Sequence, residues 1–173
     1  ILFLLLVYKF YREKKKANRI LEEQNHIISD QKKEITDSIE YASKIQSAIL
    51  PRKELLDKLL GTYFILYLPK DIVSGDFYWV KEYGRKIITV AADCTGHGVP
   101  GAFMSMLGVA FLEEIASNNT ELSSNEIIGK LREKIIISLH QQEEDELSSK
   151  DGMDLSMSVI DYQNKTIEFT GAY

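Results

Sequence analysis

Two segments of the chain combine aspartate with glycine at the point where a strand pattern begins or ends. The first is Val-Ser-Gly-Asp-Phe at positions 73–77, where Asp76 opens a strand. The second is Ala-Ala-Asp-Cys-Thr-Gly-His-Gly at positions 91–98, where Asp93 closes the next strand. Carboxylate oxygens are hard ligands that suit Mg²⁺ or Mn²⁺, and glycines let backbone carbonyls or water approach a small ion closely. These residues are candidate metal ligands.

The strands that carry Asp76 and Asp93 are predicted to pair as a hairpin. Apolar strand patterns cover 77–81 and 86–92, and Gly84 in the turn can take positive φ. Counting back from the turn puts the two aspartates at the same end of the sheet, where they would repel each other unless a cation lay between them. An Asp-Gly pair beside a strand is often only a turn. The residues alone therefore leave both a turn and a metal site open.

Four further residues near these segments have structural as well as chemical explanations. Cys94 is the only cysteine, which excludes an internal disulfide and a cysteine-rich zinc site. A lone cysteine is more often a small buried residue than a nucleophile, and His97 alone is more often a surface or structural histidine than a catalytic one. Asp151 and Asp154 precede a later strand, so they either form a strand-entry turn, or one of them reaches a third metal ion.

The elements around the hairpin predict an α+β layered domain. Pro51 ends a long helix, and a short helix over 53–60 ends at Gly61. Helices are expected over 98–117 and from Ser123, where Glu126 completes a capping box. Further strands are expected at 63–68, 155–160 and 167–172. The order is then three strands, two helices and two strands.

Residues 1–8 are all apolar or aromatic, and residues 9–19 carry six basic side chains: Lys9, Arg12, Lys14, Lys15, Lys16 and Arg19. A bilayer-spanning helix needs about 20 residues, so eight residues are too few to cross a membrane. We therefore expect residues 1–8 to be the end of a transmembrane helix of a single-pass or multi-pass protein, in a chain truncated at both ends. Basic residues directly after such a helix place the rest of the chain in the cytoplasm. A buried strand or the end of a core helix is the alternative.

Residues 12–50 contain neither glycine nor proline and predict one long helix. An apolar residue recurs every seven positions: Leu21, Ile28, Ile35, Ala42 and Ile49. The second seam positions are mostly polar: Gln24, Gln31, Ser38 and Ile45. This pattern predicts a weak parallel coiled-coil homodimer. A weak coil would suit a transmitter that shifts or rotates, and a passive spacer is the alternative.

The charge of the chain is unevenly distributed. The net charge is -5 although residues 9–19 are basic, so the remainder is strongly acidic. An acidic domain argues against binding of nucleic acid. The 173 residues are enough for one domain plus a helical extension. Because 45% of them are hydrophobic, the domain can form a sizeable core.

With these motifs in place, the sequence resembles the SpoIIE-like branch of the PPM (PP2C-type) metal-dependent serine/threonine phosphatases over about residues 40–173. Four stretches carry the resemblance: Ile-Gln-Ser-Ala-Ile-Leu-Pro at 45–51, Val-Ser-Gly-Asp-Phe-Tyr at 73–78, Ala-Asp-Cys-Thr-Gly-His-Gly-Val-Pro-Gly-Ala at 92–102 and Asp-Gly-Met-Asp at 151–154. The second and third together are highly specific. The apolar start and coil also resemble sensor-linked members of this family.

The resemblance implies a partial αββα sandwich with two Mn²⁺ or Mg²⁺ ions at one edge. Asp93 would bridge both ions, the backbone carbonyl of Cys94 would bind one, and Asp76 would contact the site directly or through water. The ions would activate water for attack on a phosphoserine or phosphothreonine of a substrate protein. Gly75, Gly96, His97 and Gly98 belong to the same motifs.

Two departures from the family pattern limit this expectation. His97 lies four residues after Asp93, whereas the eukaryotic branch has a histidine two residues after the bridging aspartate, so a role as an acid does not carry over. The family also takes further metal-binding aspartates from sequence beyond Tyr173. We therefore expect a transmembrane end at 1–8, a juxtamembrane and coiled-coil segment at 9–50, and the N-terminal part of a phosphatase domain at 51–173 that is inactive by itself.

Two other functions remain to be weighed. A signalling scaffold that keeps the phosphatase fold without catalysis is the alternative from a different class. The dimerisation region of a sensor histidine kinase would also follow a membrane helix. It is disfavoured because His26, the only histidine of the coil, is followed by Ile-Ile-Ser-Asp rather than by an acid-and-arginine phosphoacceptor motif.

Overall fold

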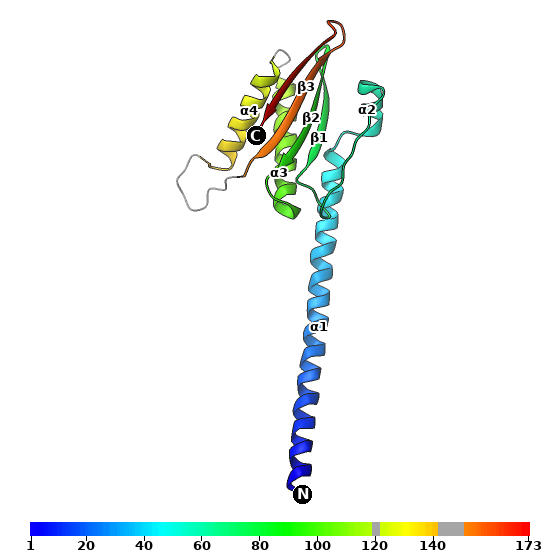
Figure 1. The fold of residues 1–173 in the computed structure, drawn as a ribbon, viewed down its shortest axis with the longest axis vertical. Coiled ribbons are helices and arrows are strands. Elements are labelled where there is room, and N and C mark those ends of the chain that lie inside the picture. Colours follow the sequence, from blue (N-terminus) through cyan, green and yellow to red (C-terminus); the bar gives the residue numbers. More distant parts are fainter. Residues whose placement is uncertain (119–121, 142–150) are drawn as a thin grey trace. The chain divides into compact units, whose positions relative to one another are not determined.

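The computed structural model describes residues 1–118, 122–141 and 151–173. By its internal contacts the chain divides into two units, Ile1–Tyr41 and Ala42–Tyr173. The first unit is the N-terminal stretch of a helix, α1 (Leu2–Ile49). The second unit contains the last turns of α1 and all the other helices and strands of the described residues (Figure 1).

The first unit is an exposed helix. Three residues of the predicted apolar seam, Leu21, Ile28 and Ile35, are 56%, 60% and 61% exposed. Ion pairs one turn apart join Arg19 to Glu23 at 3.1 Å and His26 to Asp30 at 2.9 Å, and such pairs add modest stability to an isolated helix. The long helix is confirmed, and its pairing into a coiled coil stays a prediction.

Four antiparallel strands form the sheet of the second unit, in the spatial order β1-β2-β3-β4. They are β1 (Phe77–Tyr83), β2 (Lys86–Cys94), β3 (Met153–Asp161) and β4 (Thr166–Ala172). The predicted hairpin is confirmed, with a turn of only two residues in which Gly84 has φ +60°. This is the mixed α+β class with an antiparallel sheet that the sequence predicts.

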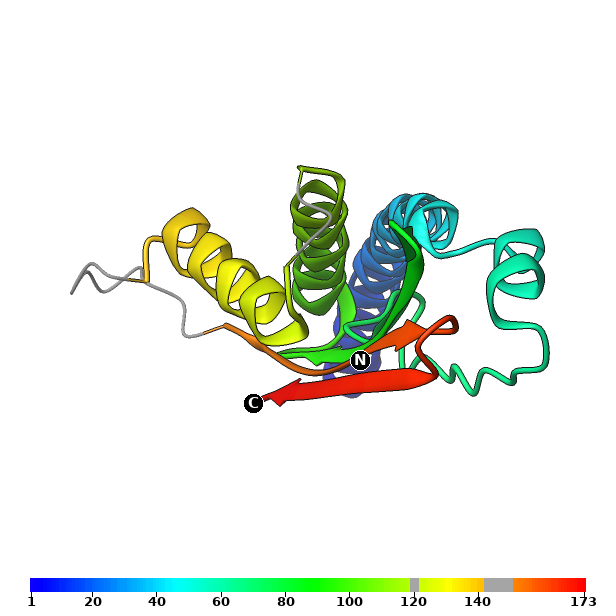
Figure 2. The same cartoon turned by 90° about the horizontal axis from the view of Figure 1, so that it is seen from above.

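Helices α3 (Gly98–Asn118) and α4 (Ser124–Ser138) cover one face of this sheet (Figure 2). The core between the layers contains the fully buried residues Ile88, Leu112, Ile127 and Met157. The predicted capping box of Ser123 and Glu126 is present at the start of α4. Among the described helices, α3 alone has the length and apolar composition to cross a membrane, and half of its apolar stretch is buried in this core.

The other face of the sheet is only partly covered. Near the hairpin turn, Leu56 and Leu59 of α2 (Lys53–Leu60) pack against Val80 and Ile87. The strand predicted at 63–68 is wrong: this segment has no strand structure. It has the apolar pattern of a strand, but a strand also needs a hydrogen-bonded neighbour. Most of its side chains instead stay exposed, Phe64 at 90% and Leu66 and Leu68 at 77% each, whereas Tyr63 and Tyr67 are half-buried.

Candidate metal centre

Three aspartates lie in a row at one end of the sheet, on the face opposite α3 and α4. Asp93 and Asp154 are direct partners across β2 and β3. The pairing of Phe77 with Ala92 places Asp76, the residue before β1, next to Asp93. Side chains alternate between the faces of a strand, so the aspartates face away from the buried core. All three line the same groove.

The carboxyl group of Asp93 influences the ionisation of Asp76. The pKa of Asp76 is raised above its ordinary value of 3.8, first by partial burial, then by hydrogen bonding to Asp93 and by repulsion from its charge. Two carboxylates placed so close together disfavour the doubly charged state. A divalent cation between them would relieve this repulsion, which is the electrostatic setting expected of a metal site.

The donor atoms at this end fit part of the ligand set of a hard cation. Asp76 and Asp93 supply carboxylate oxygens, and the carbonyl oxygens of Cys94 and Gly96 lie beside the loop that carries Asp76. Oxygen donors of this kind suit Mg²⁺ or Mn²⁺. Within the described residues, however, no group of three or more His, Cys, Asp or Glu side chains is placed to hold one ion.

Three glycines bring the two loops of the site into backbone contact. A Cβ on residue 75 would lie 2.9 Å from the carbonyl oxygen of Gly96 and 3.1 Å from that of Cys94. A Cβ on residue 101, in the first turn of α3, would lie 2.6 Å from the Gly96 oxygen and 3.0 Å from the Cα of Gly75. No side chain fits at either position, so Gly75, Gly96 and Gly101 together set the spacing of the loops.

Residues 64–68 line the same groove as the aspartates. The Tyr67 hydroxyl donates to the backbone carbonyl of Asp76 at 3.4 Å. The Tyr67 ring meets the Tyr78 ring edge-on, with centroids 5.8 Å apart. An apolar and aromatic wall therefore stands beside the acidic end of the sheet.

Cys94 and Asp151 have mainly structural surroundings. The Cys94 side chain is buried, and burial followed by the charges of Asp93 and Asp76 raises its thiol pKa to about 12, so the thiol stays protonated at neutral pH. Asp151 accepts a hydrogen bond from the Thr95 hydroxyl at 3.3 Å, and the Gly152 amide donates to the same hydroxyl at 2.8 Å. Asp151 thus ties the start of β3 to the loop after Asp93 and is not among the residues lining the groove.

His97 is exposed and lies in the loop between β2 and α3. Its Nδ1 atom is 3.0 Å from the Asp71 carboxylate. Gly98, the first residue of α3, has φ +64° and lies next to the same carboxylate, since a Cβ on residue 98 would be 3.6 Å from Asp71 Oδ2. His97 and Gly98 belong to the sequence motif at 92–102, whereas their partner Asp71 lies outside the motifs.

Gln46 lies in the 45–51 stretch that carries the family resemblance, although no site role was predicted for it. It is the one buried residue of α1, 5% exposed. Its Nε2 donates to the Ser74 carbonyl at 2.5 Å and to the Ser105 hydroxyl at 2.8 Å, and its Oε1 accepts from the Ser74 amide at 2.9 Å. The Ser74 hydroxyl in turn accepts from the Asp76 amide at 3.0 Å. In the sequence, the sign of a buried role for this residue is a polar side chain at position 46 between the apolar Ile45 and Ile49.

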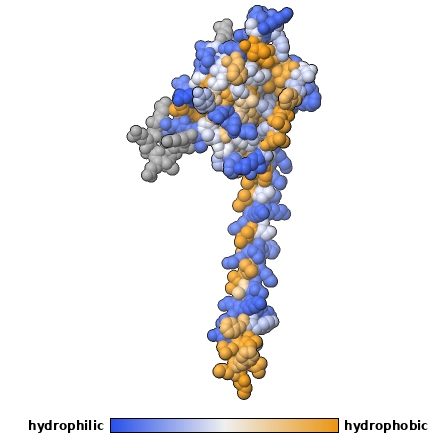
Figure 3. Space-filling view, viewed as in Figure 1, coloured by the Kyte–Doolittle hydropathy of each residue, from blue (hydrophilic) through white to orange (hydrophobic). Residues whose placement is uncertain are grey.

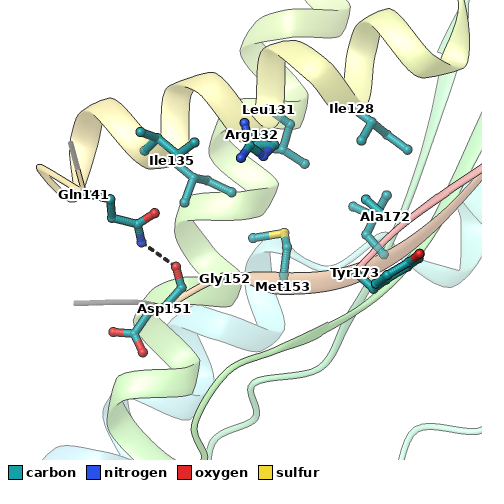
Figure 4. A pocket seen from close by; sticks show the side chains of 12 residues that line it. Ile128, Leu131, Arg132, Ile135, Gln141, Asp151, Gly152, Met153, Ala172 and Tyr173 are labelled. Carbon is teal, nitrogen blue, oxygen red and sulfur yellow. Dashed lines mark hydrogen bonds between the residues drawn. The ribbon is translucent and has the colours of Figure 1, made fainter. Parts of the chain in front are cut away.

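A separate cavity of about 240 Å³ lies between α4 and the strands β3 and β4 (Figure 4). Its lining is mostly apolar, with Ile128, Leu131 and Ile135 above Met153 and Ala172. At its rim, Gln141 donates to the backbone carbonyl of Asp151 at 2.5 Å. The cavity brings no pair of reactive groups together, so the groove with the aspartates remains the candidate site.

Comparison with known proteins concerns the fold. No family model matches the chain, and no curated protein matches it. Among solved structures, the chain is similar to the SiaA-PP2C domain of Pseudomonas aeruginosa, with 34% sequence identity and a TM-score of 0.71. The match covers 82% of this chain and 55% of the neighbour, so the chain spans about half the length of that structure. The chain therefore has a PP2C-like fold over the matched part, and the likeness supports the PP2C (PPM-type) phosphatase family for it.

Proposed function

We propose that this chain is part of a metal-dependent protein serine/threonine phosphatase of the SpoIIE-like branch. The observation that carries the proposal is the facing pair of carboxylates, Asp76 and Asp93, at one end of the sheet. The similarity of the chain to a PP2C domain, at 34% sequence identity, supports it. The substrate class is a phosphoserine or phosphothreonine protein.

Asp76, Asp93 and the carbonyl oxygen of Cys94 are the groups that would hold the ions, two Mn²⁺ or Mg²⁺ in the complete site. When bound, such ions supply Lewis acidity and an activated water for hydrolysis of a phosphomonoester. The chain itself places two carboxylates close together, and their combined negative charge attracts a cation. The protonated Cys94 thiol takes no part as a nucleophile, so we propose no phosphocysteine intermediate.

The activity is proposed for the whole protein. The chain spans 55% of its structural neighbour, and the described residues supply no cluster of three acidic, histidine or cysteine ligands. We propose that further ligands come from sequence outside these 173 residues. By themselves, residues 1–173 should bind Mn²⁺ weakly and hydrolyse phosphopeptides little or not at all.

Hydrolysis of a phosphopeptide by the full-length protein tests this function. We expect activity that depends on Mn²⁺ and is abolished by Asp93→Asn. Asp57→Asn, which changes an exposed aspartate on α2, is the matched control and should leave the activity unchanged. Activity that is absent, or that survives Asp93→Asn, would contradict the catalytic proposal.

We also propose that α1 anchors the protein to the membrane and relays a signal. The N-terminal end of α1 is a cluster of exposed apolar side chains, followed by polar ones (Figure 3). The order of apolar and basic residues supports a membrane anchor with the phosphatase domain in the cytoplasm. The exposed seam of Leu21, Ile28 and Ile35 suits a second copy of the same helix, because burying it requires a partner with the same spacing.

The last turns of α1 reach the site through Gln46. This side chain holds Ser74, whose hydroxyl accepts a hydrogen bond from the amide of Asp76. A rotation of the helix end would therefore act on the loop that carries Asp76. Inserting four residues near Ser38 shifts the phase of the seam, whereas inserting seven preserves it. We expect the four-residue insertion alone to change the activity of the full-length protein, and equal activity in both would leave the coil as a tether.

The alternative is a signalling scaffold that retains the phosphatase fold without catalysis. The observation that favours it is the incomplete ligand cluster of the described residues. The two functions differ in a direct measurement. A scaffold would bind a phosphoprotein partner equally well with and without Mn²⁺ and would not be altered by Asp93→Asn.

A further inference from the structure

Asp71 and His97 form an exposed pair beside the candidate centre, on the two segments that carry its ligands. Asp71 lies five residues before Asp76, and His97 lies four residues after Asp93. Their side chains are 42% and 71% exposed, and His97 Nδ1 is 3.0 Å from Asp71 Oδ2. The pair joins the segment before β1 to the loop after β2.

These two segments are already in contact on their inner side. Gly75 packs against the carbonyl oxygens of Cys94 and Gly96 at distances that admit no side chain. Gln46 holds Ser74 from the direction of the core. The segment from Asp71 to Asp76 is thus fixed at Ser74 and Gly75, and its outer end is held to the opposite loop by the bond from Asp71 to His97.

Stability alone gives little reason for this pair. Exposed pairs of this kind contribute about 0–1 kcal/mol to folding, and the inner contacts at Ser74 and Gly75 do not fix the outer end of the segment at Asp71. The position of the pair, between the two loops that carry the candidate ligands, gives it an effect on loop geometry instead. A bond that spans the two ligand-bearing loops restricts how far Asp76 can move relative to the Cys94 carbonyl.

We propose that Asp71 and His97 are positioning residues for the metal centre, which hold the Asp76 segment and the Cys94–Gly98 loop at the separation that binds a divalent cation. This inference rests on the proposed function. Groups that orient metal ligands typically change metal affinity by 10–100-fold when removed. The pair acts through the loops rather than on a ligand directly, so we expect an effect of about tenfold, at the lower end of that range.

The test measures Mn²⁺ affinity by isothermal titration calorimetry on the full-length protein. Asp71→Ala and His97→Ala should each weaken Mn²⁺ binding about tenfold. The double variant should be no weaker than either single one, because both remove the same bond. His97→Asn should restore binding, since the Asn amide can donate to Asp71 from about the place of Nδ1. Glu82→Ala, which removes an exposed ion pair with Lys58, is the control and should leave binding unchanged.

Several results would overturn the positioning role. Mn²⁺ affinity within about twofold of the parent in both alanine variants would exclude it. Failure of His97→Asn to restore binding would show that the bond to Asp71 is not the cause. Unchanged affinity with hydrolysis lost in both His97 variants would instead assign His97 to proton transfer. If the parent itself binds no Mn²⁺, the proposed function fails, and that result is distinct from a parent that binds Mn²⁺ with variants that do so equally well.

Discussion

The two faces of the sheet are built from the same strands, yet one is closed and the other is open. On the closed face, alternate residues of β2 and β3 pack under α3 and α4 in a dry core that includes Ile88, Leu112 and Met157. On the open face, the residues between them include Asp93 and Asp154, in a groove with Asp76. The comparison shows how a single alternating pattern separates stability from chemistry, because each strand contributes every second residue to each task.

The largest effect should come from removing a carboxylate of the open face. Asp76→Asn should lower Mn²⁺-dependent phosphopeptide hydrolysis by the full-length protein by about 100-fold or more, the scale of losing one group that stabilises the transition state. Thermal stability without metal should not fall, because the substitution removes repulsion from Asp93. Steady-state kinetics and a melting curve check the two parts. A marked fall in melting temperature that accompanies the loss of activity would mean that the open face also contributes to stability.

A change on the closed face should lower stability and leave activity per folded molecule intact. Leu112 is fully buried between the sheet and the helices, so Leu112→Ala should lower the free energy of unfolding by about 3 kcal/mol. Activity per folded molecule should be retained. Ile137→Ala, on the exposed side of α4, is the control and should cost less than about 0.5 kcal/mol. Denaturant unfolding measures both, and equal costs would contradict the assignment of the core.

Close backbone contacts at Gly75 and Gly101 hold together the two loops at the end of the sheet that carries the aspartates. Gly101→Ala places a methyl group 2.6 Å from the carbonyl oxygen of Gly96, against backbone that cannot rotate away. We expect a loss of about 1–3 kcal/mol in stability together with weaker Mn²⁺ binding. Gly129→Ala is the matched control, because nothing lies within 4 Å of its Cβ position in the interior of α4. It should stabilise the protein by about 0.5–1 kcal/mol, so two changes of the same kind should have opposite signs.

The smallest effect concerns pH and distinguishes the two ends of the sheet. The folded pKa of Asp76 is raised, so its contribution to stability is present below its ordinary value of 3.8 and is lost as pH rises through the folded pKa. The pKa of Asp161, at the β3–β4 turn, is lowered, chiefly by hydrogen bonds from Asn164. Its contribution is present above 3.8 and is lost as pH falls through the folded pKa.

Unfolding of the metal-free protein between about pH 3 and pH 6, on either side of the ordinary aspartate value, measures both contributions. Asp76→Asn should become more stable than the parent as pH rises. Asp161→Asn should be less stable than the parent at the upper end, with a gap that narrows as pH falls. Parallel curves for the parent and both variants would contradict these assignments.

Local signals predicted most of the fold. The hairpin, the helix after it and the capping box at Ser123 follow from alternation, glycine position and capping chemistry, all of which act within a few residues. The segment at 63–68 shows the limit of such signals. Its apolar pattern is that of a strand, but whether a strand forms depends on a partner elsewhere in the chain.

The same limit applies to the candidate site. The hairpin turn was enough to bring Asp76 and Asp93 to one end of the sheet, because their separation is counted along two adjoining strands. The place of Asp154 opposite Asp93 depends on β3 pairing with β2 across about 60 residues, which no local pattern specifies. The partners of Gln46 and His97 are likewise distant in sequence, 28 residues away at Ser74 and 26 residues away at Asp71.

Anomalous diffraction from crystals of the full-length protein soaked in Mn²⁺ tests the metal centre most directly. We expect a manganese peak within coordination distance of both Asp76 and Asp93, about 2–2.5 Å from carboxylate oxygens, and its loss in Asp93→Asn crystals. A well-ordered groove without a peak, or a peak that is bound elsewhere and unaffected by Asp93→Asn, would contradict the claim that these two aspartates form a metal centre.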